Sequence, residues 1–440
     1  MANVIYFEII NPNCAGIDIG AKNIFVSTDG ETVESYETFT GDYLRCVNDL
    51  QAKGVKRVAM EATGVYWMAL YELLEKAGIT VCLVHPKYTK QLKGQKTDPK
   101  DSRWIQRVFA AGLLKESYVP SGLIKAIRLL TRERQDVIEM GSAYVNKMQK
   151  HLEQMNIKLK NVIAQIHGVS GIKMIEAIIS GERDAKKILM LCDVRIIKDK
   201  KEKVLKALEG NYNETNIYLL AQNLKMWKQH QEQIAEIDKK IEEVLIKLSS
   251  DKPEINPRNV AKQIRHHKPQ IKELNKLLLK IFGVDMNNIP GVNDYTLLRL
   301  LGETGIDMSR FPTEDHFVSW CQLAPRWNQS GQSHRKVKMR NGSIAGQIFR
   351  ESAQAMMNSK HIAIGAFIKR LSARKGAPIA IKAGARKIAL VYYNLLTKGG
   401  EYVEKGVEKY QIQQQLRERR TLEKLAQKYN LKLIEIQGTA

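Results

Sequence analysis

The stretch "LKGQKTDPKDSRW", residues 92–104, combines two carboxylates with several cations. Asp98 and Asp101 are three residues apart, so both side chains lie on one face if this segment is helical. Asp98 before Pro99 is also typical of a helix N-terminus. There Asp98 would cap the helix, and the negative charge of Asp101 in the first turn would interact favourably with the helix dipole. The stretch alone leaves capping and metal chemistry open. The cations around it are Lys87, Lys90, Lys93, Lys96, Lys100 and Arg103.

Two further carboxylates occur in apolar strand patterns upstream. Asp18 interrupts "GIDIG", and Glu61 lies near the end of "RVAMEAT". A carboxylate inside an apolar strand is costly unless it is paired, hydrogen-bonded or bound to a cation. Between residues 15 and 120 the patterns follow the order βββαβαβα, which predicts an α/β sandwich with right-handed crossovers. In an RNase-H-like sheet of this order the first and fourth strands are neighbours, so Asp18 and Glu61 would meet.

A helix after the sheet would bring Asp98 and Asp101 to the same place. Four convergent carboxylates repel one another unless divalent cations neutralise them, and oxygen-only ligation suits Mg²⁺ or Mn²⁺. Two such ions about 4 Å apart are the usual means of activating the oxygens in phosphodiester chemistry. The surrounding lysines and arginine would then hold the polyanion on which the metals act. Capping and metal binding are compatible roles for the two aspartates.

The charge of the whole chain indicates the same class of partner. Its 440 residues include 70 Lys and Arg against 47 Asp and Glu, a net charge of +23. Such an excess favours nucleic acid or an acidic membrane surface. The sequence has no apolar run of membrane-spanning length and no signal-peptide pattern, so we expect a cytoplasmic, nucleoid-associated protein. The five cysteines are scattered without a CxxC pair, which argues against zinc knuckles and disulfide frameworks.

The centre of the chain predicts two long helices. Apolar residues recur with 3-4 spacing over residues 217–248, with polar interruptions at Gln231 and Asp238. Residues 124–155 have the same spacing with three interruptions. We expect an antiparallel coiled coil with two shorter basic helices between its arms. The segment "SSDKPEINPRN", residues 249–259, has two prolines and indicates a linker.

The C-terminal part is predicted to be mainly helical. "NNIPGVNDYTLLRLLGETG" resembles a helix-hairpin-helix element, whose Gly-bearing turn can present backbone N–H groups to a phosphate. A long irregular loop is expected after it, around "LAPRWNQSGQSHRKVKMRNGS". In this loop Ser330 precedes Gly331, and a serine before a glycine in a polar segment is on its own typical of a turn.

In combination, these blocks resemble a known family. "GIDIGAKNIFVST", "MEATGVYW", "VCLVHPKYTKQLKGQKTDPKDSRWIQRVFAAGLL" and "SWCQLAPRWNQSG" are similar to the transposases of insertion-sequence family one-hundred-and-ten. The resemblance covers nearly the whole chain and continues through "AIKAGARKIALVYYNLLTKGGEYV". It implies a Holliday-junction-resolvase-like (RuvC-like), RNase-H-type N-terminal domain whose acidic tetrad binds Mg²⁺. By motif the tetrad falls on Asp18, Glu61, Asp98 and Asp101.

The resemblance also implies a serine nucleophile that forms a covalent phosphoserine intermediate with DNA. The matching residue is Ser330, with Ser333 as the rival. Many relatives have a second glycine where this chain has Gln332, which leaves the local geometry open. A serine hydroxyl needs deprotonation or metal activation to attack a phosphate. Five residues of this loop are expected to contact nucleic acid: Arg326, Trp327, His334, Arg335 and Lys336. For the four that can carry positive charge, the alternative to phosphate binding is simple exposure to solvent.

The resulting expectation is an RNA-guided DNA transposase. A structured non-coding RNA, the bridge RNA of the family, would pair with donor and target DNA. The protein would act as a homo-oligomer, a dimer or, in the synaptic complex, a tetramer. Two alternatives stay open: a metal-dependent, structure-selective nuclease of the junction-resolvase type without a covalent intermediate, and a non-enzymatic RNA-binding protein on a decayed nuclease fold.

The expected architecture has four parts, divided where the sequence pattern changes. Residues 1–120 would form the α/β RNase-H-like nuclease domain. Residues 121–280 would form the coiled coil with its basic helical insertion. Residues 285–400 would form a mainly α transposase domain with the serine loop, and residues 401–440 a charged helical tail.

Overall fold

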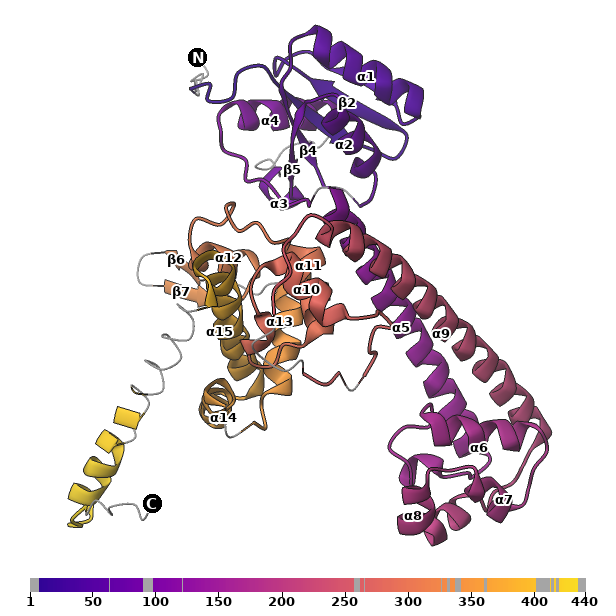
Figure 1. Ribbon diagram of the computed structural model, residues 1–440. Helices are drawn as coiled ribbons and strands as arrows, with labels where there is room; N and C mark the ends of the chain where they lie inside the picture. The colour runs from indigo at the N-terminus through magenta and orange to yellow at the C-terminus, as the bar shows by residue number, and fades with distance from the viewer. Residues whose placement is uncertain are drawn as a thin grey trace. The chain divides into compact units, whose positions relative to one another are not determined.

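In the computed structural model, a mixed sheet forms near the N-terminus and the remainder is largely helical (Figure 1). The chain divides into two compact units, residues 1–119 and 120–440. Within the described part of the chain, no helix is long and apolar enough to span a bilayer. The structure describes residues 8–62, 64–89, 98–120, 122–256, 262–264, 266–325, 327–330, 333–336, 342–359, 362–400, 412, 415–416 and 419–433.

The first unit is built on a five-stranded sheet of order β3-β2-β1-β4-β5. Its strands are β1 (Cys14–Ile19), β2 (Asn23–Ser27), β3 (Glu34–Glu37), β4 (Arg57–Glu61) and β5 (Thr80–Val84). The first three strands form an antiparallel meander, whereas β4 and β5 run parallel to β1. Parallel neighbours need crossover helices, which the predicted order of elements supplies. The mixed sheet is consistent with the RNase-H-like fold expected from the sequence.

Helices cover both faces of this sheet because alternate strand residues point to opposite sides. On one face, Ile17 and Ile19 pack against the helices α1 (Thr40–Ala52) and α2 (Trp67–Lys76). On the other face, Cys14 and the apolar residues of β4 and β5 pack against α4 (Asp98–Ala110). The short helix α3 (Pro86–Thr89) precedes α4 in the chain.

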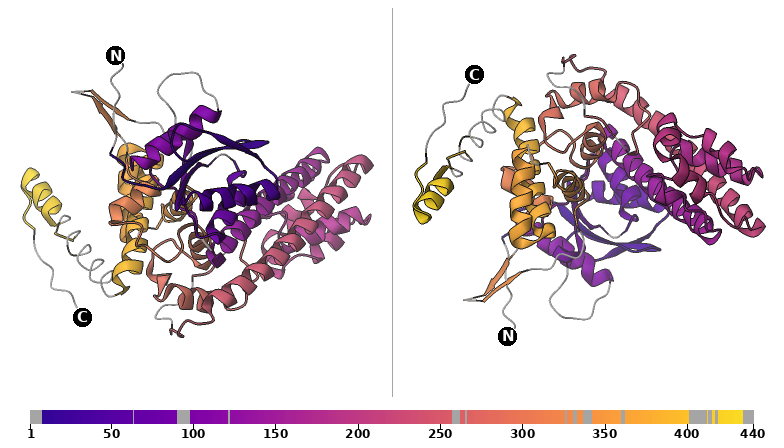
Figure 2. Two further views of the ribbon diagram at one scale, coloured as in Figure 1. Left: turned by 90° about the horizontal axis from the view of Figure 1, so that it is seen from above. Right: turned by 90° about the horizontal axis from the view of Figure 1, so that it is seen from below.

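Two long helices, α5 (Gly122–Gln154) and α9 (Glu214–Ser249), lie side by side in the second unit (Figures 1 and 2). They are antiparallel, because Arg134 contacts Asp238 whereas His151, further along α5, contacts Asn216, nearer the start of α9. The far end of the pair is covered by η1 (Leu159–Asn161), α6 (Val169–Ile179), α7 (Ala185–Met190) and α8 (Val194–Ala207), with their own apolar core. Three α-helices, α6, α7 and α8, therefore connect α5 to α9, where the sequence analysis expected two. The sequence analysis did not predict the apolar helix α6.

Two polar interruptions of the helix pairing face each other. The guanidinium of Arg134, 1% exposed, donates to the carboxylate of Asp238, 0% exposed, at 2.6 and 3.3 Å. Arg134 Nη2 also donates to the carbonyl of His267 at 3.0 Å, and the N–H of Gln270 donates to Asp238 Oδ2 at 2.8 Å. Because a buried charge needs its partner, this pair is expected to select one register of α5 against α9.

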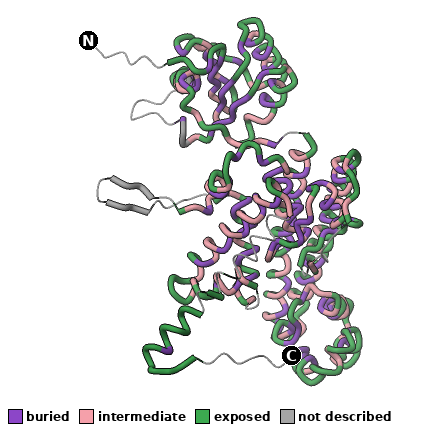
Figure 3. Tube along the Cα trace, turned by 60° about the vertical axis from the view of Figure 1, so that its left-hand side comes forward, coloured by how far each residue is buried: buried purple, intermediate pink, exposed green. Residues whose placement is uncertain are grey.

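The C-terminal part of this unit is a helical bundle with an aromatic core. Phe317, Phe349 and Tyr392 are fully buried and stack or meet edge to face. The helices are α10 (Leu274–Phe282), η2 (Met286–Asn288), α11 (Asp294–Thr304), α12 (Glu314–Trp320), α13 (Ile344–Ala355), α14 (Ala363–Lys375) and α15 (Ala377–Lys398). In the tail, residues 419–428 are helical, and nearly all of the described residues there are exposed (Figure 3).

One element corrects the expectation of an irregular loop. Strands β6 (Trp327–Ser330) and β7 (Ser333–Lys336) form an antiparallel two-stranded hairpin. Only two residues, Gly331 and Gln332, separate the strands. A glycine first in a two-residue connection is a hairpin signal, because type II′ turns favour glycine there. The polar composition of the flanking residues obscured this signal in the sequence.

Candidate active site

Asp18 and Glu61 occupy equivalent positions on neighbouring parallel strands. The register of β1 against β4 places Ile17 opposite Met60, and Asp18 and Glu61 are the next residue of each strand. Parallel neighbours are about 4.8 Å apart. Since side chains alternate, Asp18 lies on the same face as Gly16, the face that α4 covers. The sheet topology therefore brings these two half-buried carboxylates to one edge and one face.

The close approach of α4 to β1 depends on Gly16. A Cβ atom at this position would lie 2.3 Å from the backbone nitrogen of Gln106 and 2.5 Å from the carbonyl oxygen of Ser102. Ser102 is fully buried at this contact. A glycine inside a strand often marks such an approach of another backbone. Gly16 therefore belongs to the site, although the sequence analysis singled out only its neighbour Asp18.

The direction of α4 determines where its aspartates lie. The carbonyl of Phe109, near the end of α4, accepts a hydrogen bond of 2.7 Å from Asn11 Nδ2, just before β1. Ser102, nearer the start of the helix, lies over Gly16. The helix thus runs opposite to β1, and its first turn, with Asp98 and Asp101, lies toward the strand end that carries Asp18.

Replacing Gly16 with alanine is expected to destabilise the first unit by about 1–3 kcal/mol, because the new methyl group would overlap two backbone atoms of α4. The helix would have to shift, so the thermal midpoint of unfolding should fall. Thermal unfolding followed by circular dichroism would measure the change.

Gly41→Ala is the matched control for this substitution. Gly41 is in the first turn of α1, and a Cβ atom there would meet nothing within 4 Å. Alanine in a helix is favoured over glycine by up to about 1 kcal/mol, so this variant should be as stable as the parent or more stable. Equal midpoints for Gly16→Ala and Gly41→Ala would show that α4 does not rest on β1 as described.

A buried hydroxyl contacts the acidic edge from α3. Thr89 is 6% exposed, and its Oγ1 donates a hydrogen bond to Glu61 Oε2. This contact orients one oxygen of the Glu61 carboxylate. Sequence analysis missed Thr89, since a single threonine at the end of a short helix has no periodic signal.

The four carboxylates supply only oxygen donors, which fits a hard divalent cation such as Mg²⁺ or Mn²⁺. Among the side chains that the structure describes, no three His, Cys, Asp or Glu gather closely enough to hold a metal ion. The side chain of Asp98 is not among those described. The strand register brings Asp18 and Glu61 together, and the direction of α4 places its first turn toward the same strand ends; a metal site formed by all four carboxylates stays a prediction.

The predicted cations around the tetrad are described only in part. Lys100 and Arg103 are exposed on α4. Lys87 falls in α3, but its side chain is outside the description, as are Lys90, Lys93 and Lys96 altogether.

The predicted serine nucleophile lies at the end of the β6–β7 hairpin. Ser330 and its rival Ser333 pair directly across the two strands, and the other pairs are Gln329 with His334, Asn328 with Arg335 and Trp327 with Lys336. The backbone of the two strands is described, whereas their side chains, the connection at residues 331–332 and the whole of Arg326 are not. Both serines therefore flank the same two-residue connection.

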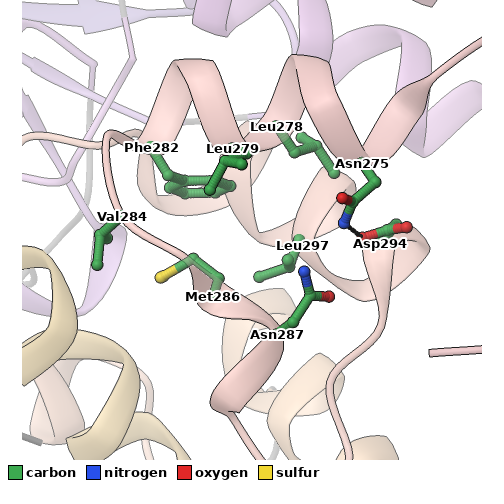
Figure 4. A pocket seen from close by; sticks show the side chains of 9 residues that line it. All are labelled: Asn275, Leu278, Leu279, Phe282, Val284, Met286, Asn287, Asp294 and Leu297. Atoms are coloured by element: carbon green, nitrogen blue, oxygen red, sulfur yellow. Dashed lines mark hydrogen bonds between the residues drawn. The ribbon is translucent and has the colours of Figure 1, made fainter. Parts of the chain in front are cut away.

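A small cavity lies beneath the helix-hairpin-helix-like segment (Figure 4). Its empty volume is about 180 Å³, including open solvent, and it is bounded by apolar residues of α10 and α11 with a polar edge. On that edge Asn275 Nδ2 donates to Asp294 Oδ1 at 3.0 Å, and burial raises the pKa of Asp294. The preceding turn backs onto α13, since a Cβ at Gly291 would lie 2.7 Å from the carbonyl of Ser352. We assign this cavity to the packing of α10 against α11.

Comparison with known protein families finds two matches along the chain. Residues 15–157 match a model described as "Transposase", the DEDD transposase model of IS110 elements. Residues 286–364 match a model described as "Transposase IS116/IS110/IS902 family". The first segment contains all four predicted carboxylates and the second contains Ser330. Comparison with curated proteins gives no significant match.

Proposed function

The chain belongs to the IS110 family of transposases, and we propose that it cleaves and rejoins DNA through a phosphoserine at Ser330, assisted by a Mg²⁺-binding tetrad of Asp18, Glu61, Asp98 and Asp101. The observation that supports the tetrad most strongly is the equivalent placement of Asp18 and Glu61 on adjacent strands, under the first turn of α4. A serine hydroxyl in addition to an acidic metal site is what a covalent protein–DNA intermediate needs and hydrolysis by water does not.

The chemical step proposed for Ser330 is a transesterification. Its Oγ forms a bond to a DNA phosphorus, the bond from that phosphorus to one deoxyribose oxygen breaks, the serine proton passes to solvent and the departing oxygen takes up a proton. Because the phosphoserine keeps the ester, a second deoxyribose hydroxyl can displace the serine and restore the DNA strand. Mg²⁺, when bound by the carboxylates, would stabilise the negative charge that develops on the phosphate oxygens. Thr89 would keep Glu61 oriented for that role.

The proposal includes partners that follow from charge and from the paired helices. We propose that a bridge RNA pairs with donor and target DNA, so that base pairing selects the sequence and the protein binds mainly backbone and shape. The net charge of +23 supports a polyanionic partner. We further propose that α5 and α9 act as an antiparallel coiled coil in a dimer, or in a synaptic tetramer, which brings acidic and serine half-sites to the same phosphate. The proposed cationic contacts are those around α4 and around the β6–β7 hairpin.

The first test removes either the metal ion or the carboxylate of Asp18. With RNA, donor DNA, target DNA and Mg²⁺, the parent protein is expected to give a detergent-resistant protein–DNA adduct and recombinant DNA. A chelator, or Asp18→Asn, should lower both products on the order of a hundredfold or more, since charge stabilisation at the phosphate is lost. Denaturing gels with labelled DNA would measure both products.

Glu37→Gln provides the matched control, because Glu37 is an exposed carboxylate on β3 at the edge of the same sheet. It should leave both products unchanged. Metal-dependent cleavage without any adduct would instead favour the junction-resolvase alternative. Absence of cleavage by the parent protein, with normal RNA binding, would favour the decayed nuclease.

A further inference from the structure

The C-terminal helices contain a stretch without acidic residues. From Ser352 to Gly400 there are nine Lys and Arg and no Asp or Glu, so all 47 acidic residues of the chain lie elsewhere. These residues lie outside the nucleic-acid contacts assigned above to α4 and to the β6–β7 hairpin. Because this stretch carries cations and no carboxylate, it is a candidate surface for a polyanion.

The stretch folds into a tightly packed pair of helices. α14 and α15 are joined by Gly376 alone, which has a φ of +83° and ends α14 while it starts α15. They pack closely at Gly384, where a Cβ atom would lie 2.5 Å from the side chain of Ile368. Gly365 of α14 is packed as closely, since a Cβ atom at this position would lie 2.2 Å from the carbonyl oxygen of Ser359. The two helices therefore lie side by side as one packed pair (Figure 1).

Most of the exposed cations of the stretch lie on α14. Arg370 and Arg374 are one helical turn apart, about 6 Å along α14, and both are exposed. Lys369 and Lys375 beside them are exposed as well. On α15, Lys398 is exposed, whereas Lys382, Arg386 and Lys387 are half-exposed. Lys387 Nζ lies 4.8 Å from the ring centroid of Phe367 on α14, and Arg386 pairs at 2.7 Å with Asp315, a carboxylate from α12.

We propose that this surface, named the cationic hairpin and comprising the outer faces of α14 and α15, binds the phosphate backbone of duplex DNA without reading its sequence. Duplex DNA presents one negative charge per about 1.7 Å of its axis, and its counterions are released when Lys and Arg replace them. No acidic side chain of the stretch itself repels the phosphates. DNA is chosen over RNA because the family identifies DNA as the substrate. To that extent the inference rests on the proposed function.

The test compares two variants that lose the same charge. The first replaces Lys369, Arg370, Arg374 and Lys375 with glutamine. The control replaces four exposed lysines of α8, which alternate with Asp199 and Glu202, with glutamine: Lys198, Lys201, Lys203 and Lys206. Fluorescence anisotropy with a labelled duplex in chelator, over a range of salt, measures binding without cleavage.

The first variant is expected to bind duplex DNA at least tenfold more weakly and to lower the slope of log affinity against log salt by about 3 to 4, one unit per lost phosphate contact. The control should bind within about twofold of the parent protein. A third variant that exchanges Lys and Arg at the same four positions keeps the charge and should bind like the parent. Thermal melts followed by circular dichroism verify that each variant is folded.

Equal losses in the first variant and the control would overturn the proposal, since only total charge would matter. A loss confined to a structured RNA of the same length would overturn the assignment to DNA. Because binding is measured in chelator, these results do not depend on catalysis. If the parent protein formed no adduct with Mg²⁺ while the first variant still bound duplex DNA more weakly than the parent, the proposed function would be contradicted and the cationic hairpin supported.

Discussion

Replacing Ser330 with alanine is expected to abolish the covalent protein–DNA adduct while duplex binding in chelator stays within twofold of the parent protein. The reason is chemical: alanine has no hydroxyl to bond to phosphorus, whereas the carboxylates of the first unit are untouched. Loss of a nucleophile commonly costs on the order of 10³-fold or more. Adduct and recombinant DNA would be quantified on denaturing gels with labelled DNA, the protein being tested with its RNA and Mg²⁺.

Ser333→Ala is a close control for this experiment. Ser333 pairs with Ser330 across the hairpin, so the two substitutions change the same place by the same atom. Adduct formation by Ser333→Ala at the parent level, together with its loss in Ser330→Ala, would assign the nucleophile to Ser330. The reverse pattern would assign it to Ser333. An adduct that persists when both Ser330 and Ser333 are replaced with alanine would contradict a serine nucleophile at this hairpin.

Replacing Asp238 with alanine is expected to lower the free energy of unfolding of the second unit by about 3–5 kcal/mol. The substitution leaves the guanidinium of Arg134 buried without its counter-charge, and it removes the acceptor of the Gln270 N–H. Because α5 and α9 are the longest described helices, urea denaturation followed by far-ultraviolet circular dichroism reports on this unit. A marked fall of the denaturation midpoint is the expected result.

Replacing both partners separates the cost of an unpaired charge from the value of the pair. The double substitution Arg134→Leu with Asp238→Leu is expected to be close to neutral, since well-packed apolar residues often replace buried ion pairs without loss. Glu243→Gln, in the exposed pair with Lys240 on α9, should not move the midpoint. If Asp238→Ala were as neutral as Glu243→Gln, the Arg134–Asp238 pair would not be desolvated as the structure describes.

Much of the fold could be predicted from local patterns. Alternation and turn residues identified the strands of the first unit, because each strand is short and its signal lies within a few residues. The 3-4 spacing identified α5 and α9 for the same reason. The sequence could not predict that Arg134 and Asp238, which interrupt that spacing, face each other, since their contact depends on the register of two helices 104 positions apart.

The candidate site was likewise predictable from the sequence only in part. The residue types and spacing at Asp18, Glu61, Asp98 and Asp101 were enough to suggest oxygen-only metal chemistry. The β6–β7 hairpin had a glycine signal that was available but overlooked. Thr89 had none, because its role comes from where the end of α3 meets β4.

The sequence by itself indicated the class of chemistry, because carboxylates, cations and a serine hydroxyl are the groups that metal-assisted phosphate chemistry uses. It also determined the local elements that present them. Only the tertiary structure decided the register of β1 against β4, the crossing of α4 over β1 at Gly16 in the opposite direction, and the packing of α14 against α15. These outcomes depend on packing between segments that are distant in the sequence. There, a single Cβ atom or a one-residue change of register changes which residues are in contact.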